Sequence, residues 1–298
     1  MTLVPLPDLL GDARTGKYAV GYFEAWDVYS LEAVIAAAEA ERSPVIIGIG
    51  GLSAEHSWLQ NGGIEIYGAV CETLARRSRM PIATLWNEAE SFSEAAAGLR
   101  AGFNAVMIHT HGWETERVLT ETRALVAAAH GVGVAVEGEV GQLAEMREGE
   151  VDEDLGEVTT PEEAVEFVAQ TGVDCLSVAV GNVHFVTAGY TPSIRVDRIR
   201  EVSQVVDVPL VLHGGSGTPP DQMQAAIAAG ITKINVGTRL KEVFGTAVRE
   251  ALAGDEDDPN ILWGSRFPGD VLRKGGEALT ADVIRLMQVF GSSGRVGA

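Results

Sequence analysis

Residues 209–238 read PLVLHGGSGTPPDQMQAAIAAGITKINVGT, and this stretch contains one complete strand–helix–strand unit. Its two apolar runs, 209–212 and 231–236, are continuous rather than alternating, as is typical of parallel strands buried on both faces. The segment 219–229 between them is predicted to be a helix, because Pro219 suits a first turn and Gly230 suits the position after a helix end. The stretch therefore predicts two parallel strands joined by a helix.

The same alternation extends over nearly the whole chain. Strands are predicted at residues 19–23, 44–49, 81–86, 105–108, 132–136, 175–180, 209–212 and 231–236. Helices are predicted at residues 30–41, 64–77, 92–101, 116–130, 161–170, 196–205, 219–229 and 240–252. Eight repeats in about 250 residues favour an α/β fold, a closed (β/α)8 TIM barrel, over the alternative of an open doubly wound sheet.

No linker interrupts this pattern, so residues 1–298 are expected to form a single barrel domain. Within it, residues 254–298 are expected to form a C-terminal helical extension that includes a helix at 280–290. The acidic segment 149–157 is expected to be a loop after the fifth strand.

The composition excludes several classes of protein. A formal net charge of −20 would repel the phosphate backbone of nucleic acids. No run approaches the roughly 20 apolar residues of a membrane span, and the N-terminus lacks a signal-peptide pattern. Cys71 and Cys175 are the only cysteines, which argues against a disulfide framework. We therefore expect a cytoplasmic globular protein whose partner is a small molecule rather than a nucleic acid or a membrane.

Reactive side chains gather where the predicted strands end. In such barrels the catalytic groups lie at the C-terminal ends of the strands. The residues at these ends are Glu24, Gly50, Gly51, Asn87, Glu88, His109, Glu137, Glu139, Asn182, His184, and residues 213–216 and 235–238. Three of the six histidines of the chain are among them, which core packing does not explain, because barrel interiors consist mainly of branched aliphatic residues.

His184, His213 and Glu139 follow neighbouring predicted strands and form a candidate metal site. Two imidazoles and a carboxylate suit Zn²⁺ or another borderline divalent cation. The alternative is that each histidine is only a hydrogen-bonded residue of the barrel rim.

Two glycine-containing loops form a candidate anion site. One loop contains Gly214, Gly215 and Ser216, and the other contains Asn235, Gly237 and Thr238; each precedes a predicted helix. Backbone N–H groups at such turns bind phosphate, and barrels often bind it between the seventh and eighth strands. The alternative is that the glycines only form tight turns.

Several motifs together resemble the class II, metal-dependent fructose-bisphosphate aldolase family, which also includes tagatose-bisphosphate aldolases. These motifs are AVGYF (19–23), SPVII (43–47), AGF (101–103), VMI (106–108), VEGEVG (136–141), TGVD (171–174), GNVH (181–184), LHGGSG (212–217), INVGT (234–238) and FGSSG (290–294). The resemblance covers nearly the whole chain. It implies a carbon–carbon lyase with a divalent metal, Zn²⁺ above all, and a homodimer or homotetramer.

The resemblance also implies roles for individual residues. His184 and His213 match metal ligands, and Glu139 matches a glutamate that coordinates the metal or stands just behind it. The residues that match groups holding the phosphate and hydroxyls of a dihydroxyacetone-phosphate-like unit are Gly214, Gly215, Ser216, Asn235 and Thr238.

The chain departs from the family pattern at the predicted barrel rim. Asn87 and Glu88 stand where the family has an Asp-His pair, and an amide cannot accept a proton as a carboxylate does. His109 replaces an Asp and becomes a candidate third imidazole ligand. Glu24, a candidate substrate-binding residue, replaces an Asn, and Phe185 replaces a Gly. Because losses of Asp and His are matched by gains of Glu and His, the changes indicate a retuned active site.

We therefore predict a metal-dependent aldolase that cleaves a phosphorylated ketose or related ketone through a metal-stabilised enediolate. Glu88 is the first candidate for proton transfer, beside Asn87 at the family's base position. If Glu88 is a metal ligand, Glu24 or Glu137 is the next candidate. Two alternatives stay open: a metal-dependent isomerase, epimerase or cyclase of a sugar phosphate, and a non-catalytic phosphosugar-binding homologue.

Overall fold

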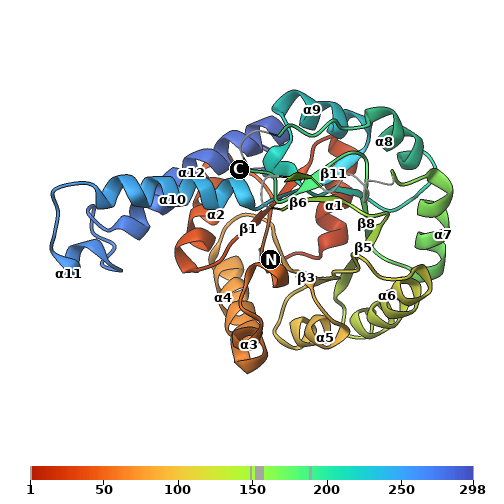
Figure 1. Ribbon diagram of the computed structural model, residues 1–298, viewed down its shortest axis with the longest axis horizontal. Coiled ribbons are helices and arrows are strands. Elements are labelled where there is room, and N and C mark those ends of the chain that lie inside the picture. The colour runs from red at the N-terminus through yellow and green to blue at the C-terminus, as the bar shows by residue number, and fades with distance from the viewer. Residues whose placement is uncertain (1, 148–149, 152–157, 188–189, 298) are drawn as a thin grey trace.

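Eight parallel strands form a closed barrel in the order β1-β11-β10-β8-β5-β4-β3-β2 (Figure 1). The structure is a computed structural model that describes residues 2–147, 150–151, 158–187 and 190–297. The barrel strands are β1 (Val20–Glu24), β2 (Val45–Gly50), β3 (Ile82–Ala89), β4 (Ala105–Ile108), β5 (Ala135–Val140), β8 (Cys175–Val178), β10 (Leu210–Leu212) and β11 (Ile231–Val236). The predicted α/β TIM-barrel fold is confirmed.

Helices surround the barrel, and each of the eight helices predicted between residues 30 and 252 coincides with an observed one to within two residues at either end. The helices are α1 (Leu6–Gly16), α2 (Val28–Glu41), α3 (His56–Trp58), α4 (Ile64–Arg77), α5 (Phe92–Arg100), α6 (Thr115–His130), α7 (Pro161–Thr171), α8 (Val196–Ser203), α9 (Pro220–Ala229), α10 (Thr238–Leu252), α11 (Pro259–Leu262) and α12 (Val271–Phe290). Shorter turns are η1 (Gly51–Ser53), η2 (Leu59–Gly63) and η4 (Gly215–Gly217).

A small additional sheet, which the apolar pattern does not predict, has the strand order β7-β6-β9. Its strands are β6 (Ala144–Arg147), β7 (Glu150–Val151) and β9 (Val183–His184). Of the predicted loop 149–157, the structure describes only Glu150 and Val151, which form β7; the remainder lies outside the described residues.

The prediction for β5 is wrong at both ends, since the strand runs over Ala135–Val140 rather than over residues 132–136. Glu137 and Glu139 belong to the strand instead of following it, and both are buried. The apolar run stops early because this strand carries carboxylates on one face, and residues two apart in a strand share a face. β3 likewise continues to Ala89 and includes Asn87 and Glu88.

α1 covers the N-terminal end of the barrel, and no pattern in the sequence analysis predicts it. Its buried residues Leu6, Leu9 and Leu10 pack with interior residues of the strands, including Tyr22 of β1 and Ile46 of β2. Burying three leucine side chains contributes several kcal/mol, at about 1.5–3 kcal/mol each. This end of the barrel is therefore closed by apolar packing.

The C-terminal helices extend beyond the barrel. α10 and α12 run side by side away from it, with α11 at the far end (Figure 1). Arg239 of α10 donates two hydrogen bonds of 2.7 Å to the buried carboxylate of Asp282 in α12. α12 begins at Val271, earlier than the predicted start at residue 280, because Asp270 caps it by accepting a hydrogen bond from the N–H of Leu272.

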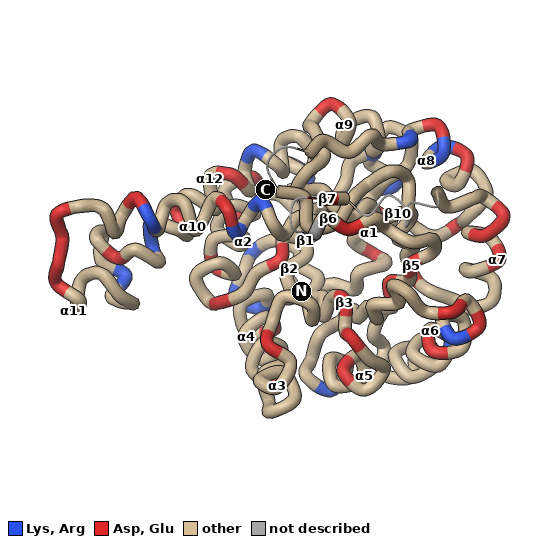
Figure 2. The backbone as a smooth tube through the Cα atoms, in the orientation of Figure 1, with Lys and Arg blue, Asp and Glu red and all other residues tan. Residues whose placement is uncertain are grey.

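Acidic residues are spread over the outer helices and loops (Figure 2), in keeping with 42 Asp and Glu against 22 Lys and Arg in the chain. Among the described residues, no helix combines the length and the apolar character that crossing a membrane requires.

Candidate active site

Glu88 stands at an irregular point of β3. The pairing of β3 with β4 shifts between Trp86 and Ala89, and Glu88 has a left-handed backbone with φ of 52°. This conformation costs a non-glycine residue about 1–2 kcal/mol, and such strain is typical of functional sites. At this kink the Glu88 carboxylate is buried beside the imidazoles of His184 and His213.

Glu88, His184 and His213 form a compact cluster of potential metal ligands. Nδ1 of His213 lies 3.3 Å from Oε1 of Glu88 and 3.2 Å from Nε2 of His184. One ligand atom from each of the three residues lies within 4.8 Å of the other two. Imidazole nitrogens and a carboxylate oxygen are ligands of zinc in catalytic sites that keep an open position. The donor set therefore fits a divalent cation.

Behind His213, a buried network fixes the orientation of its ring. Nε2 of His213 lies 2.8 Å from Oε1 of Glu137, and Oε2 of Glu137 lies 2.7 Å from Nζ of Lys233. Lys233 also donates a hydrogen bond of 2.5 Å to Oδ1 of Asn235. The side chains of Glu137 and Lys233 are 0% exposed. A carboxylate behind a metal-binding histidine orients the ring, and here it directs Nδ1 toward Glu88.

The pKa shifts of the cluster follow from burial and pairing. Burial lowers the pKa of His184 to about 4, so its ring is neutral at pH 7. Burial also acts against protonation of His213, but hydrogen bonds to Glu137 and Glu88 outweigh it and raise the pKa to about 9. Burial of Glu88 is likewise outweighed by its hydrogen bond with His213, and its pKa falls to about 2. Without a cation, a proton on His213 therefore balances the Glu88 charge, and metal binding would displace that proton.

Glu139 lies outside this cluster, as judged over the described residues. Its carboxylate accepts a hydrogen bond of 3.4 Å from Ser177 and lines a separate cavity of about 490 Å³ between α6 and α7. Burial raises its pKa to about 7; the charge of His213 opposes this rise and that of Glu88 adds to it. A carboxyl group that titrates near neutral pH is suited to acid–base catalysis.

His109 also lies outside the cluster of converging ligand atoms found among the described residues. Its backbone N–H donates a hydrogen bond of 2.8 Å to the carbonyl of Ala89, and its ring stacks on that of His111 with 5.8 Å between centroids. Burial lowers the pKa of His109. The imidazole is therefore near the end of β3 but is not one of the three grouped ligands.

The two glycine loops line a cavity beside the cluster. Gly214 has φ of 69°, and a Cβ there would lie 2.3 Å from a backbone oxygen of β9, so only glycine fits. Oγ of Ser216 accepts hydrogen bonds from the N–H groups of Gly237 (3.1 Å) and Arg239 (3.2 Å), which ties the two loops together. Ser216 and Thr238 thus form the cavity wall at the N-terminal end of α10, where a helix favours anions.

Glu24 lines the same cavity and is paired with a lysine. Its Oε1 accepts hydrogen bonds from Ser53 (2.6 Å) and from Nζ of Lys241 (2.9 Å). A Cβ at Gly50 or Gly237 would come within 2.9 Å or 3.2 Å of the Glu24 carboxylate. The two glycines therefore leave the space that this side chain occupies.

Within the part of the chain that the structure describes, two buried polar atoms on the cavity wall have no hydrogen-bond partner: Oδ1 of Asn87 and the hydroxyl of Tyr22. Buried polar groups are nearly always hydrogen-bonded. Two such orphans on the wall of one cavity therefore indicate a polar ligand. Asn87 offers an acceptor, and Tyr22 offers a donor, since burial raises its pKa well above the usual value.

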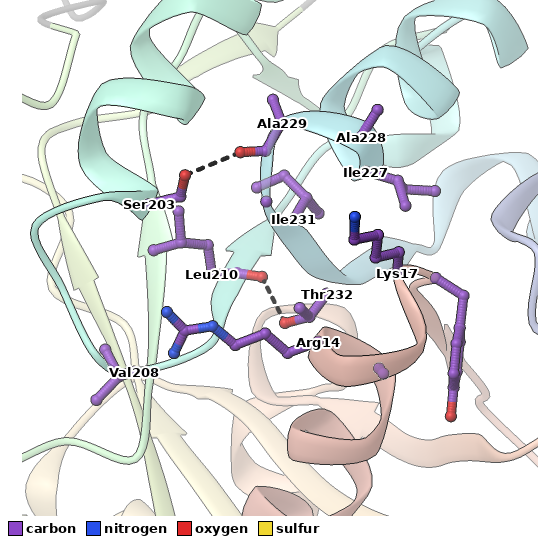
Figure 3. A pocket seen from close by; sticks show the side chains of 13 residues that line it. Arg14, Lys17, Ser203, Val208, Leu210, Ile227, Ala228, Ala229, Ile231 and Thr232 are labelled. Atoms are coloured by element: carbon purple, nitrogen blue, oxygen red, sulfur yellow. Dashed lines mark hydrogen bonds between the residues drawn. The ribbon is translucent and has the colours of Figure 1, made fainter.

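A different cavity, of about 220 Å³, lies at the N-terminal side of β10 and β11, next to α1 (Figure 3). Its wall is mainly aliphatic, and Arg14 donates hydrogen bonds to the backbone carbonyls of Val206 and Asp207. Because its described lining contains no carboxylate or imidazole side chain, it is not a candidate metal site.

Four residues of the site are not predicted by the sequence analysis: Tyr22, Ser53, Lys233 and Lys241. Lys233 had a usable signal, because it interrupts the apolar run 231–236 and lies two positions before Asn235, on the same face of β11. Ser53 and Lys241 come from η1 and α10; both donate a hydrogen bond to Glu24, and Lys241 also donates one of 3.0 Å to Oγ of Ser53. No local pattern marks them.

Comparison with known proteins identifies the family of the chain. The family model "Fructose-bisphosphate aldolase class-II" matches residues 4–295. The fructose-bisphosphate aldolase of Geobacillus stearothermophilus is 36% identical over 300 residues, with 99% of each chain covered. A probable fructose-bisphosphate aldolase of Bacillus subtilis (strain 168) is 34% identical, with 98% of this chain and 99% of that protein covered.

A solved structure agrees as well. The crystal structure of the YdjI aldolase from Escherichia coli K12 matches with a TM-score of 0.83 and 29% identity, and covers 99% of this chain and 100% of that one. Class II aldolases are carbon–carbon lyases that depend on a divalent metal, and the cluster of Glu88, His184 and His213 suits such an ion. The expected family is confirmed: the chain belongs to the class II fructose-bisphosphate aldolase family.

Proposed function

We propose that this enzyme cleaves a phosphorylated ketose, or a related ketone, in a retro-aldol reaction with an altered ligand set. The observation that carries this proposal is the convergence of Glu88, His184 and His213 beside a cavity with unpartnered polar atoms. Glu88 takes the place of the histidine that the family resemblance leads one to expect.

Glu88, His184 and His213 would hold the ion, for which Zn²⁺ is the proposed identity. A divalent cation bound there would supply a Lewis acid for the ketone carbonyl and for the negative charge that develops during C–C cleavage. Glu137 has a positioning role, because it contacts His213 and Lys233 rather than the cavity. With Glu88 acting as a ligand, the proton must be transferred by another group.

Glu139 is the proposed proton-transfer group: although it lines the neighbouring cavity, it lies close enough to His213 and Glu88 for their charges to shift its pKa, and a pKa of about 7 allows it to exchange a proton near neutral pH. Asn87 would orient a substrate hydroxyl by accepting a hydrogen bond at its unpartnered Oδ1. The Tyr22 hydroxyl would donate to a substrate oxygen. Orientation of this kind contributes to the rate without requiring Asn87 to titrate.

The phosphate end of the substrate would lie against the two glycine loops. Ser216 and Thr238 line this wall, and Lys241 supplies a positive charge on it. Glu24 partly balances the charge of Lys241, so this wall carries less net positive charge than an unpaired lysine would give it. We infer that the substrate presents one phosphate, together with hydroxyl groups that donate hydrogen bonds to the Glu24 carboxylate.

A second candidate function is a metal-dependent isomerase, epimerase or cyclase of a sugar phosphate. It is favoured by Asn87, whose amide cannot act as a base although its oxygen lies unpartnered at the site. Both candidates use the same ion and the same phosphate wall, so only the products separate them.

The experiment is metal analysis of the purified enzyme, followed by incubation with ketose mono- and bisphosphates and product analysis by NMR. A lyase gives two fragments from one substrate, whereas an isomerase or epimerase gives one product of unchanged mass. Binding of phosphosugars without turnover, whichever divalent metal is added, would instead identify a non-catalytic homologue.

A further inference from the structure

A second group of potential metal ligands lies outside the catalytic cluster. His56 begins α3, Glu90 follows the end of β3, and Glu94 lies in the first turn of α5. One ligand atom of each residue lies within 4.8 Å of the other two. The group therefore joins the segment after β2 to the turn that follows β3.

The carboxylate of Glu94 points to a missing ligand. Glu94 is 4% exposed, and its Oε2 accepts a hydrogen bond of 3.0 Å from the N–H of Glu90. Its Oε1 is fully buried and has no hydrogen-bond partner among the described residues, although Nδ1 of His56 lies 2.8 Å away. A buried carboxylate oxygen without a donor is costly, so its position calls for a cation.

The spacing of the three atoms suits coordination. Nδ1 of His56 lies 3.3 Å from Oε2 of Glu90 as well as 2.8 Å from Oε1 of Glu94. Ligands bonded to zinc at about 2.0–2.2 Å in a tetrahedral arrangement lie roughly 3.4 Å from one another. The 3.3 Å separation is close to this value, and the 2.8 Å contact, which lacks hydrogen-bond geometry, would lengthen when an ion binds between the two atoms.

The remaining nitrogen of His56 has a partner of its own. Nε2 lies 2.7 Å from the side-chain amide of Gln60. The amide of Gln60 can present either its NH2 group or its oxygen to His56. With the oxygen facing the ring, Gln60 accepts a hydrogen bond from the Nε2–H of His56. That tautomer leaves Nδ1 with a free lone pair. A hydrogen bond from the other ring nitrogen, here to Gln60, is what orients metal-binding histidines.

We propose that His56, Glu90 and Glu94 bind a second divalent cation, of the zinc type, separate from the catalytic ion. Ser53, which donates a hydrogen bond to Glu24 in the catalytic cavity, lies three residues before His56. A cation at this second site would hold the segment 51–58 against the turn after β3. It would thereby fix Ser53 at the cavity while making no contact with substrate.

The test is the metal stoichiometry of the full chain. Metal-free protein is dialysed against Zn²⁺, or against Co²⁺ for its absorption spectrum, and the bound metal is measured by elemental analysis. We expect two equivalents in the native chain and one in His56→Ala and in Glu90→Gln. Both changes are at half-exposed side chains, so folding is expected to survive. Glu72→Gln, at a surface glutamate that pairs with Arg76, is the matched control and should retain two equivalents.

Glu88→Gln separates this site from the catalytic one. It should lose the catalytic ion while retaining the ion that His56→Ala loses. A second readout is hydrogen exchange at residues 51–58, which Zn²⁺ should slow in the native chain and not in His56→Ala. One equivalent in the native chain, or two equivalents in both His56→Ala and Glu90→Gln, would overturn the proposal and leave the assignment of the catalytic site untouched.

Discussion

The imidazole rings of His184 and His213 stack face to face, with 5.2 Å between their centroids and 21° between their planes. This arrangement brings Nε2 of His184 to 3.2 Å from Nδ1 of His213, although the two residues are carried by different strands and loops. Two ring nitrogens with a carboxylate beside them form a site that a proton or a cation must complete. These three residues are therefore a candidate site for the divalent metal on which the family depends.

Replacing Glu88 tests whether it is a ligand. Glu88→Gln keeps the size of the side chain but removes the anionic oxygen, so bound metal and kcat should both fall by at least about 100-fold, since loss of even an outer partner costs 10–100-fold. Glu88→His supplies a nitrogen ligand in its place and should retain metal. Metal content by elemental analysis and turnover of the cleaved substrate are the measurements. Near-normal values in Glu88→Gln would remove Glu88 from the site.

The raised pKa of Glu139 predicts how kcat depends on pH. Burial raises its pKa to about 7, so below that pH the carboxyl is protonated and cannot act as a base, and kcat should decline on the acid side. The hydrogen bond from Ser177 stabilises the ionised form. Ser177→Ala should therefore move the acid limb to higher pH, whereas Glu139→Gln should abolish turnover. An acid limb that stays in place in Ser177→Ala would argue against Glu139.

The contributions of Glu137 and Lys233 to the free energy of unfolding should be strongly coupled. Lys233→Met leaves the fully buried Glu137 without its cation, and breaking such a pair costs about 3–5 kcal/mol of unfolding free energy. Adding Glu137→Gln removes the uncompensated charge and should restore part of that loss. Urea denaturation of the two single variants and the double variant forms the cycle. Purely additive losses would show that the two side chains act independently.

The backbone of Phe185 should be strained. It has φ of 56°, and its side chain is 41% exposed, so little packing offsets the cost of a left-handed backbone. Phe185→Gly should be more stable than Phe185→Ala by about 1 kcal/mol, because both lose the ring but only glycine adopts this conformation freely. The comparison is made by thermal and urea unfolding. Equal stability of the two variants would show that the local backbone relaxes.

Much of the fold could be predicted because it depends on short-range patterns. Continuous apolar runs, glycines after helices and prolines at helix starts recur along the chain, and the eight helices predicted between residues 30 and 252 were each found within two residues of their place, whereas α12 starts nine residues earlier than predicted. The apolar pattern did not predict the bounds of a barrel strand that contains polar residues, as β5 does at Glu137 and Glu139. It also failed for α1, since an amphipathic segment at a chain end does not show which surface it covers.

The candidate site was predictable in its residue types and its end of the barrel, because parallel strands carry their C-terminal residues to one rim. The sequence by itself therefore determined that His184, His213 and several carboxylates would lie at the same rim. Only the tertiary structure decided which carboxylate meets the histidines. The backbone kink at Glu88 and the position of Lys233 inside the barrel depend on strand register, and register is a relation between distant segments that no local stretch of chain contains.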